Sequence, residues 1–440
     1  MDRFGITGLI IRDWTLWTEE IQKWIDWPTG TLCGVTDFVN YFPILLSLIW
    51  SASALVSIWK EWQEKARRRR SEARLPSFSI LIPFYGDADA ALRTALSVAQ
   101  IRPAPDEILL INDGSPEGSV PLDRSLLPPG ARVLELPRNV GKAEALNRGL
   151  RCIRSEIVVC MDADTRAHSM DWSGMLARFA LCPDLGGITG KIWPESVRNL
   201  AQLLQAIDYL AVICMVKCAE SLWGGLMTVS GAWVAYRRQA MIDCNGWSAK
   251  SSTEDIDLSW RLQAAGWKIA YDPHWTARVG MAATWKSLWL QRRRWSSGLG
   301  RALRDQAGGV FRHSSRHVPV AFMAFLSSLW IWLCLATLSA GAFISWKGTS
   351  FEWGDGSLLV RIVEWQFKHC SLYALIFVFQ IAVAILVDRG TWKRYPLLIL
   401  FSPLYPVYFW LILVTSFLAG FPRGMMRRDG GRWEPTAEIE

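Results

Sequence analysis

The sequence predicts an α/β domain embedded between transmembrane α-helices. Residues 76–161 alternate short apolar strands with helical stretches, and long apolar runs flank this part of the chain on both sides. Alternation of this kind is typical of a parallel sheet covered by helices on both faces. Because a membrane span needs roughly 20 mostly apolar residues, the flanking runs indicate an integral membrane protein.

Four apolar runs are candidate spans. Pro403 and Pro406 interrupt the last of them, so that run could form a re-entrant hairpin, and the side of the C-terminal tail stays open. Residues 1–37 carry too many charges to span and predict an interfacial amphipathic helix, without a cleavable signal peptide. The candidate spans are residues 41–59, 318–344, 371–387 and 396–421.

The formal net charge of +8 is explained by topology. Four consecutive arginines, residues 67–70, directly follow the first span, and basic residues near span ends mark the cytoplasmic side. Residues 61–317 are therefore expected to be cytoplasmic. Nucleic-acid binding is the rival interpretation of the arginine run. Nine cysteines without a CxxC pair and five histidines without a metal-binding pattern argue against a disulfide framework or a zinc site.

Acidic residues follow two of the predicted strands. Strands are predicted over residues 78–83, 107–112, 131–136 and 156–161, with helices over residues 90–100 and 141–151. Asp113 follows the second strand, and Asp162 and Asp164 follow the fourth, at the strand ends where such sheets bind ligands. Two carboxylates two residues apart could hold Mg²⁺ or Mn²⁺ together with a diphosphate. The alternative is an ordinary polar turn.

Two further patterns in this domain have both a structural and a functional interpretation. Gly141-Lys142 is not a P-loop, because Leu136 occupies the position of the glycine that the motif requires. Lys142 at a helix start can still neutralise a phosphate. Asp113, within Asn112-Asp113-Gly114-Ser115, belongs either to a turn or to a site that reads a nucleotide base.

Downstream, Thr253-Glu254-Asp255 opens a helical stretch. Carboxylates are common at a helix start, and Ser252 with Asp255 fits a capping box. Residues 284–306 interleave tryptophans with arginines and predict an amphipathic helix on the cytoplasmic leaflet. Attraction to anionic lipid alone would also explain that composition.

Taken in order, these motifs resemble those of the processive family 2 glycosyltransferases, and are most similar to those of the bacterial poly-β-1,6-N-acetyl-D-glucosamine synthases. The resemblance runs from about residue 41 into the third or fourth span, and it implies a GT-A (Rossmann-like) catalytic domain. The motifs that carry it are Asn112-Asp113-Gly114-Ser115, Gly141-Lys142-Ala143, Thr228-Val229-Ser230-Gly231, Thr253-Glu254-Asp255 and Gln291-Arg292-Arg293-Arg294-Trp295.

The resemblance also implies residue roles. Asp255 would be the catalytic base, and Asp162 and Asp164 would hold Mg²⁺ or Mn²⁺. Such roles agree with sugar transfer, which needs a base near the acceptor hydroxyl and positive charge on the departing diphosphate. The implied donor and nucleotide site is Pro83, Tyr85, Asp113, Lys142, Asp162 and Asp164. The implied acceptor and diphosphate site is Ser230, Gly231, Glu254, Gln291, Arg294 and Trp295.

The expected activity is that of a hexosyltransferase that polymerises N-acetylglucosamine from UDP-N-acetylglucosamine and moves the β-1,6-linked chain across the bacterial inner membrane for a biofilm matrix. The resemblance implies a multi-pass protein in contact with lipids, a small membrane partner subunit and activation by cyclic di-GMP. No nucleic-acid partner is expected.

Departures from the family pattern keep alternatives open. Thr189-Gly190-Lys191-Ile192-Trp193 stands where poly-N-acetylglucosamine synthases usually carry an Asn-Pro-Arg type sequence. The chain lacks the Phe-x-Val-Thr-x-Lys motif of cellulose synthases, which makes cellulose a less favoured product. The alternatives are synthesis of hyaluronan, chitin or a cellulose-like polymer, transfer of single sugars to a lipid carrier, and a catalytically inactive scaffold or exporter subunit.

The predicted organisation has six parts. They are an N-terminal interfacial segment (1–37), a first transmembrane helix (38–60), the cytoplasmic catalytic domain (61–283), amphipathic interface helices (284–317), a C-terminal transmembrane region of about three spans (318–421) and a basic tail (422–440).

Overall fold

The computed structural model describes residues 31–69, 74–251, 253–313, 318–346, 370–387 and 396–426. The expectations for residues 1–30, for Ser252 and for the tail beyond residue 426 lie outside these ranges. The chain divides into two units, residues 1–45 with 330–365, and residues 46–329 with 366–440. In the first unit, Trp330 donates a hydrogen bond to the carbonyl of Val39 over 2.7 Å.

The second unit contains one eight-stranded sheet, whose strand order is β3-β2-β1-β4-β7-β6-β8-β5. The predicted strands are confirmed, the second of them residue for residue. The strands are β1 (Phe78–Phe84), β2 (Glu107–Asn112), β3 (Ala131–Glu135), β4 (Ile157–Met161), β5 (Arg166–Ala167), β6 (Leu185–Pro194), β7 (Trp233–Arg237) and β8 (Lys268–Val279).

The four strands from which a parallel sheet was predicted are parallel, but the complete sheet is mixed. β1, β2, β3 and β4 are parallel, but β7 runs antiparallel to both β4 and β6. The reversal arises because the helical segment after β6, from α6 (Leu200–Ile207) to α7 (Cys214–Trp223), returns the chain to the same end of the sheet at which β6 finishes. It places the start of β7 beside the end of β4, where Trp233 pairs with Met161.

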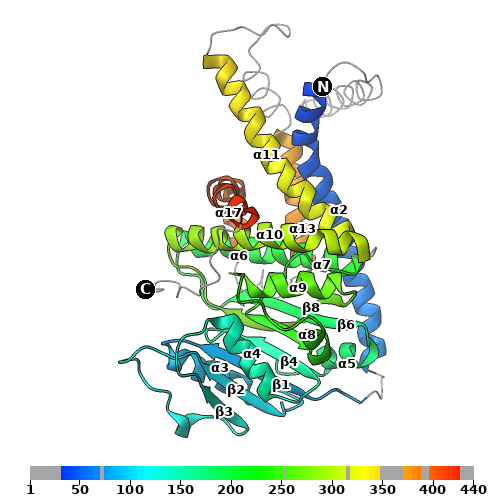
Figure 1. The fold of residues 1–440 in the computed structure, drawn as a ribbon. Helices are drawn as coiled ribbons and strands as arrows, with labels where there is room; N and C mark the ends of the chain where they lie inside the picture. The colour runs from blue at the N-terminus through cyan, green and yellow to red at the C-terminus, as the bar shows by residue number, and fades with distance from the viewer. Residues whose placement is uncertain are drawn as a thin grey trace. The chain divides into compact units, whose positions relative to one another are not determined.

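Both faces of the sheet are covered by helices, as the alternation predicts (Figure 1). Along β1, Leu81 packs into one core cluster and Ile80 and Ile82 into another, because successive side chains of a strand point to opposite faces. The helices of this domain are α3 (Ala88–Val98), α4 (Lys142–Cys152), α5 (Ser173–Leu181), α6 (Leu200–Ile207), α7 (Cys214–Trp223), α8 (Arg238–Asp243) and α9 (Glu254–Ala264).

All four predicted spans are helical in the residues described. Tyr41–Gln63 and Leu397–Met425 are long and apolar enough to cross a membrane, and shorter apolar helices cover Ala321–Ala336 and Leu375–Val387. The helices that carry them are α2 (Thr31–Arg69), α11 (Val318–Trp346), α13 (Cys370–Val387), α15 (Leu397–Phe401), α16 (Tyr405–Tyr408) and α17 (Thr415–Met425).

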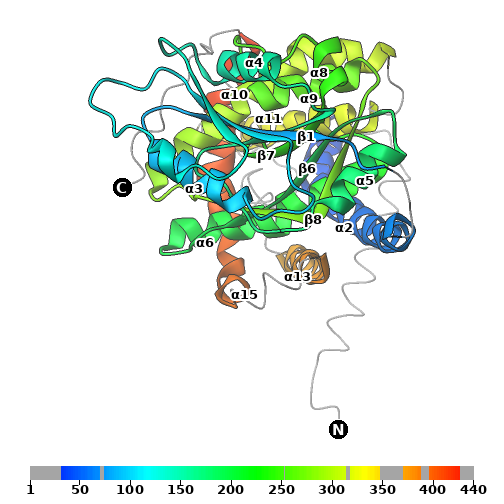
Figure 2. The same cartoon turned by 90° about the horizontal axis from the view of Figure 1, so that it is seen from below.

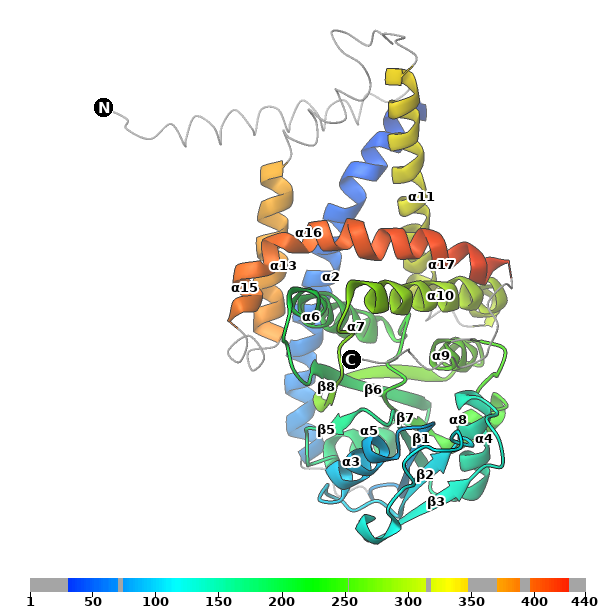
Figure 3. The same cartoon turned by 90° about the vertical axis from the view of Figure 1, so that its left-hand side faces the viewer.

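A third helix of sufficient length and hydropathy, Leu200–Trp223, was not foreseen from the sequence. The rest of the protein buries 76% of the most apolar part of this helix, compared with 22% for Tyr41–Gln63 and 28% for Leu397–Met425. It comprises α6, a π-helical segment (Asp208–Ile213) and α7, which lie between the sheet and the long helix α10 (Trp285–His313) (Figure 3). Its apolar character therefore serves protein packing.

α10 confirms the predicted amphipathic helix and extends it beyond residue 306. α17 packs along it, and glycines allow close approach: a Cβ on Gly420 would lie 2.2 Å from the Arg293 carbonyl oxygen, and one on Gly424 1.9 Å from that of Ser297. The last apolar run bends near Pro403 and Pro406, so that α16 and α17 run across the direction of α13 (Figure 3).

Candidate active site

The candidate site lies at the carboxyl ends of β2 and β4 and the start of β7. Because β1 pairs in parallel with both β2 and β4, Asp113 and Asp162 follow strands that end at the same edge of the sheet. The antiparallel β7 brings Ser230 and Gly231 to that edge as well. Viewed from below, the sheet lies between the helices of its two faces, with α4, α8 and α9 on one side and α3 and α5 on the other (Figure 2).

Asp113 is buried and holds the loop that precedes α4. Its Oδ1 accepts a hydrogen bond from the amide of Val140 and its Oδ2 one from the amide of Gly141, both at 2.9 Å. Burial raises the pKa of the Asp113 carboxyl, and these two amides counteract the rise. The Asn112 to Ser115 segment is itself a closed turn, in which Oδ1 of Asn112 accepts from the amide and the hydroxyl of Ser115.

Tyr85 and Pro83 lie on the strand beside this turn. Pro83 is buried within β1 opposite Ile111, and Tyr85 directly follows the strand and is half-buried. The turn contacts this segment where the Ser115 hydroxyl accepts a hydrogen bond from the amide of Gly86 over 2.9 Å. The two predicted donor-site residues therefore belong to the same edge as Asp113.

Asp162 and Asp164 follow β4, and the residues around them suit a divalent cation. Partial burial and the nearby charge of Asp162 raise the pKa of Asp164 to about 6, although its side chain reaches solvent. Among the residues described, no group of three or more His, Cys, Asp or Glu side chains converges. Two carboxylates with open positions fit Mg²⁺ or Mn²⁺, which take further ligands from substrate phosphates.

Lys142 joins the Asp162 end of the site to the start of α9. Its Nζ lies 2.7 Å from Oδ1 of Asp162 and 2.8 Å from Oε1 of Glu254. Burial alone would lower the pKa of Lys142, but Asp162, Glu254 and Asp255 raise it above its ordinary value. The lysine that the sequence assigns to the nucleotide thus also neutralises two carboxylates.

Asp255 lies in the first turn of α9 and contacts the loop before β7. Its Oδ2 accepts a hydrogen bond from the amide of Gly231 over 2.8 Å, and its Oδ1 accepts from the amide of Ile256 over 2.9 Å. Burial and the charge of Glu254 raise the pKa of Asp255, while Lys142 and the two amides oppose the rise. A carboxylate with a raised pKa accepts a proton more readily than an exposed aspartate does.

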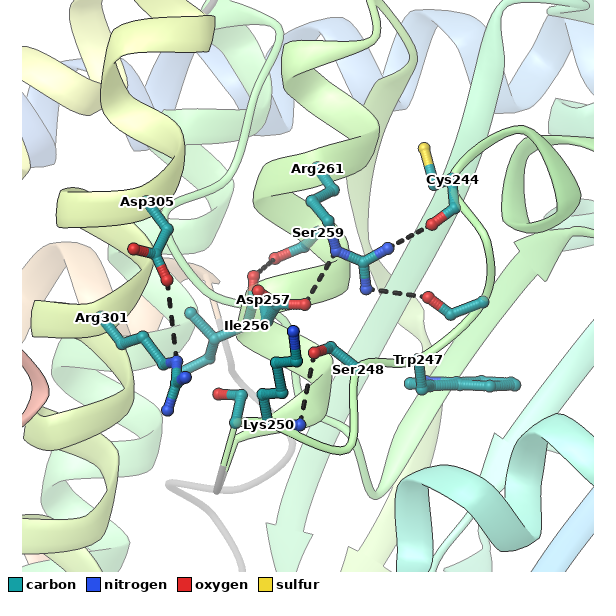
Figure 4. A network of polar contacts seen from close by, with 12 residues as sticks. Cys244, Trp247, Ser248, Lys250, Ile256, Asp257, Ser259, Arg261, Arg301 and Asp305 are labelled. Carbon is teal, nitrogen blue, oxygen red and sulfur yellow. Dashed lines mark hydrogen bonds and ion pairs between the residues drawn. The ribbon is translucent and has the colours of Figure 1, made fainter. Parts of the chain in front are cut away.

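α9 is anchored through Arg261, in its last turn, downstream of Asp255. The residue before its first turn is Thr253, and no side chain caps the helix there. Arg261 pairs with Asp257 over 2.8 Å and donates to the carbonyls of Cys244 and Gly246 (Figure 4). These contacts fix the helix against the segment that follows α8.

The three predicted residues of α10 have different environments. Trp295 is half-buried and meets the ring of Tyr209 edge to face, with centroids 6.3 Å apart. Oε1 of Gln291 is buried and has no hydrogen-bond partner among the described residues, which leaves it free for a ligand. Arg294 is exposed. α10 also packs closely against the start of α9. A Cβ added to Gly298 would lie only 1.7 Å from Oγ1 of Thr253.

A buried ion pair between Arg292 and Asp208 lies next to the Trp295 ring. Nη2 of Arg292 lies 2.8 Å from Oδ2 of Asp208, and Oδ1 of Asp208 accepts from the Tyr405 hydroxyl over 2.8 Å. The guanidinium carbon of Arg292 lies 4.3 Å from the Trp295 ring centroid. The sequence interpretation missed Asp208 and Arg292 as a pair; an acidic residue within the apolar run 200–223 was the available signal.

Lys217 was missed as well. It lies on α7, is 4% exposed, and donates from Nζ to the Ser230 hydroxyl over 2.8 Å. It too interrupts the apolar run, and a buried lysine is rare unless it has a partner. The structure thus brings Asp113, Lys142, Asp162, Ser230, Gly231, Glu254 and Asp255 to one edge of the sheet.

Comparison with known proteins supports this description. Residues 79–244 match the family described as Glycosyl transferase family 2. The chain is 26% identical to a poly-beta-1,6-N-acetyl-D-glucosamine synthase of Staphylococcus aureus over 405 residues, which are 90% of this chain and 96% of that protein. A synthase of the same name from Staphylococcus epidermidis is 25% identical over 405 residues, with the same coverage.

A similar fold occurs in a mannosyltransferase from Pyrobaculum calidifontis, solved in complex with GDP-Man and Mn²⁺. The match has a TM-score of 0.51 at 16% identity and covers 78% of this chain and 97% of that one. The fold of the catalytic domain is therefore GT-A. With the family match and the synthase relatives, these findings establish that the chain carries a family 2 glycosyltransferase domain and is a glycosyltransferase.

Proposed function

We propose that the protein is a membrane-embedded, inverting and processive glycosyltransferase that polymerises N-acetylglucosamine from UDP-N-acetylglucosamine into a β-1,6-linked chain. The observation that carries this proposal is the contact between Asp255 and the amide of Gly231, 2.8 Å long, at the same sheet edge as Asp162. It joins a carboxylate of raised pKa to the loop assigned to the acceptor. The names of the relatives supply the sugar and the linkage.

In the proposed reaction, the Asp255 carboxylate accepts the proton of the acceptor hydroxyl. The hydroxyl oxygen forms a bond to C1 of the donor sugar, the bond from C1 to the diphosphate oxygen breaks, and UDP leaves with inversion at C1. Gly231 holds Oδ2 of Asp255, and the half-buried ring of Trp295 gives the acceptor sugar an apolar face. Gln291 offers its unpartnered Oε1 to an acceptor hydroxyl.

Asp162 and Asp164 would hold a divalent cation, which when bound supplies positive charge to the departing diphosphate. Lys142 contributes on the protein side, since its ammonium already bridges Asp162 and Glu254. Pro83, Tyr85 and Asp113 complete the donor site on the neighbouring strands. Arg294, exposed on α10, would approach the diphosphate from the membrane side.

The same proposal includes translocation of the polymer across the bacterial inner membrane, by a multi-pass protein with its catalytic domain in the cytoplasm. The apolar helices and the packing of α17 along α10 support a membrane location next to the site. Export for a biofilm matrix, a small membrane partner and activation by cyclic di-GMP rest on the family resemblance. The proposed organisation keeps the catalytic domain at residues 61–283 and the interface helices at residues 284–317.

The test is UDP release by purified protein in lipid vesicles, with a panel of UDP-sugars and with Mg²⁺ or Mn²⁺. Each donor is assayed with and without cyclic di-GMP and the proposed small membrane partner. UDP release with UDP-N-acetylglucosamine, and a polymer cleaved by a β-1,6-specific hexosaminidase, are the expected results. The absence of UDP release with every donor, in the presence of the partner, would contradict the proposal.

A second candidate is a synthase of a different polymer. Lys191 stands in β6 where the family usually has other residues, and its Nζ lies 4.5 Å from the centroid of the Trp193 ring. This departure is two residues from Thr189, whose Oγ1 accepts a hydrogen bond from the amide of Ser230. UDP release with a polymer that resists the β-1,6-specific enzyme would favour hyaluronan or chitin. The same panel separates this candidate from the first.

A further inference from the structure

The loop that carries Ser230 and Gly231 is held from two sides. From α9, Gln263 donates to the carbonyl of Leu226 and accepts from its amide, both at 2.9 Å. From α7, Oε2 of Glu220 accepts from the amide of Met227 over 3.0 Å. The beginning of the loop is therefore fixed by hydrogen bonds that the sugar-transfer chemistry does not use.

The far end of the loop, next to the catalytic carboxylate, depends on Lys217. Its Nζ donates to Oγ of Ser230 over 2.8 Å, while the amide of Ser230 donates to Oγ1 of Thr189 over 3.1 Å. The next amide along the chain, that of Gly231, makes the bond to Asp255. Lys217 is thus separated from the proposed base by two adjacent residues of one loop.

The burial of Lys217 has a cost in folding free energy. This lysine is 4% exposed on α7, and an amino group taken out of water destabilises the fold unless it is hydrogen-bonded or paired. Burial lowers the pKa of Lys217 to about 8, and the nearby acidic groups only partly oppose this, so the hydrogen bond to Ser230 is the direct contact that satisfies the amino group. A methionine of similar size would fill the same space without that cost.

We propose that Lys217 is a positioning residue for sugar transfer, which holds Ser230 so that the Gly231 amide keeps Asp255 aimed at the acceptor. This inference rests on the proposed function. Lys217 is not needed to hold the beginning of the loop, because Gln263 and Glu220 already fix it. Losing Lys217 should therefore affect the transfer step more than donor binding.

The experiment compares Lys217→Met, Ser230→Ala and the double variant with the wild-type protein in lipid vesicles. Each is measured for UDP binding, UDP release and polymer formation. Lys217→Met should lower the turnover number for polymer by at least about tenfold, with UDP affinity changed by less than about twofold. The double variant should be no worse than the poorer single variant, because both changes remove one interaction.

Two further variants sharpen the comparison. Lys217→Gln keeps a hydrogen-bond donor without the charge and should recover part of the lost turnover. Lys268→Met is the matched control, since Lys268 makes a partly exposed ion pair with Asp184 at the edge of the domain and should leave activity unchanged. If Lys217→Met fails to bind UDP or to purify as a folded protein, Ser230→Ala alone carries the test, with the same expected loss of turnover.

Different results would contradict the positioning role and the proposed function. Wild-type turnover in Lys217→Met, or additive losses in the double variant, would overturn the positioning role and leave the proposed function standing. Equal losses of UDP binding and turnover in Ser230→Ala would also overturn it, because they would indicate a general structural role. A wild-type protein inactive with every UDP-sugar and its partner would overturn the proposed function, and this inference with it.

Discussion

The amide of Gly231 donates to Oδ2 of Asp255 over 2.8 Å, across 24 positions of sequence. This bond ties the loop before β7 to the first turn of α9. It requires glycine, because a Cβ at position 231 would lie 2.6 Å from that oxygen. The absence of a side chain at one residue therefore determines how close the acceptor loop lies to the proposed base.

Gly231→Ala should push Asp255 and the loop apart and lower transfer by about 100-fold, the effect expected of a misplacement of about 1 Å in a reacting group. The measurement is UDP release in lipid vesicles at saturating donor. Gly174→Ala is the control, since a Cβ on Gly174, in α5, meets nothing within 4 Å. Equal activities of the two variants would contradict the role given to the Gly231 contact.

The pH dependence of the reaction should reflect the raised pKa of Asp255. Burial and Glu254 keep this carboxyl protonated at pH values where an exposed aspartate, of pKa about 3.9, is ionised. Because the base must be ionised, kcat/KM should fall as the pH drops through the raised pKa, at a higher pH than for an ordinary aspartate. A profile at saturating metal that stays flat down to about pH 4 would contradict the assignment.

Metal dependence should show a second, separable effect. Asp164 has a pKa of about 6, so protons compete with the cation as the pH falls below that value. The metal concentration that gives half-maximal UDP release should therefore rise on going from pH 7 to pH 5. Excess metal should reverse this loss but not the one due to Asp255. A metal requirement independent of pH would argue against Asp164 as a ligand.

Lys142→Met should remove the cation that Asp162 and Glu254 share. Breaking a buried ion pair costs about 3 kcal/mol of stability, and Glu254 is only 8% exposed. Because Lys142 lowers the pKa of Asp255, its loss should also move the acid limb of kcat/KM to higher pH. Thermal unfolding in lipid and the pH profile test both effects, with Lys268→Met as control; an unmoved acid limb would contradict the electrostatic link.

The ion pair of Arg292 with Asp208 should stabilise the fold next to Trp295. Both side chains are buried, at 6% and 3% exposure, so Asp208→Asn or Arg292→Met should destabilise the protein by about 3 kcal/mol. The double variant should lose less than the sum of the two. Removing the exposed Arg124 to Glu135 pair should cost less than about 1 kcal/mol. Additive losses at Arg292 and Asp208 would contradict the pairing.

Much of the domain could be predicted from its local pattern. The strand at residues 107–112 and the aspartates after two strands follow from apolar runs that end in polar turns, and both are confirmed in the fold. The direction of β7 could not be predicted, because it depends on the path of the segment between β6 and β7. That segment is apolar, and its contacts are with the sheet and α10, which no local pattern specifies.

The site was predicted unevenly for the same reason. Asp255 and Gly231 stand in recognisable motifs, but their contact depends on the antiparallel β7. The partners of Lys142 lie 20 and 112 positions away, beyond the reach of spacing arguments. Lys217 and Asp208 interrupt an apolar run, which signals a buried polar group without naming its partner.

The most direct test of the central claim is Asp255→Asn in lipid vesicles with UDP-N-acetylglucosamine, metal and the membrane partner. The substitution keeps the size of the side chain and removes the proton acceptor. The predicted result is UDP binding close to that of the wild-type protein, with polymer synthesis lost. Polymer made at the wild-type rate would remove Asp255 as the base and contradict the account.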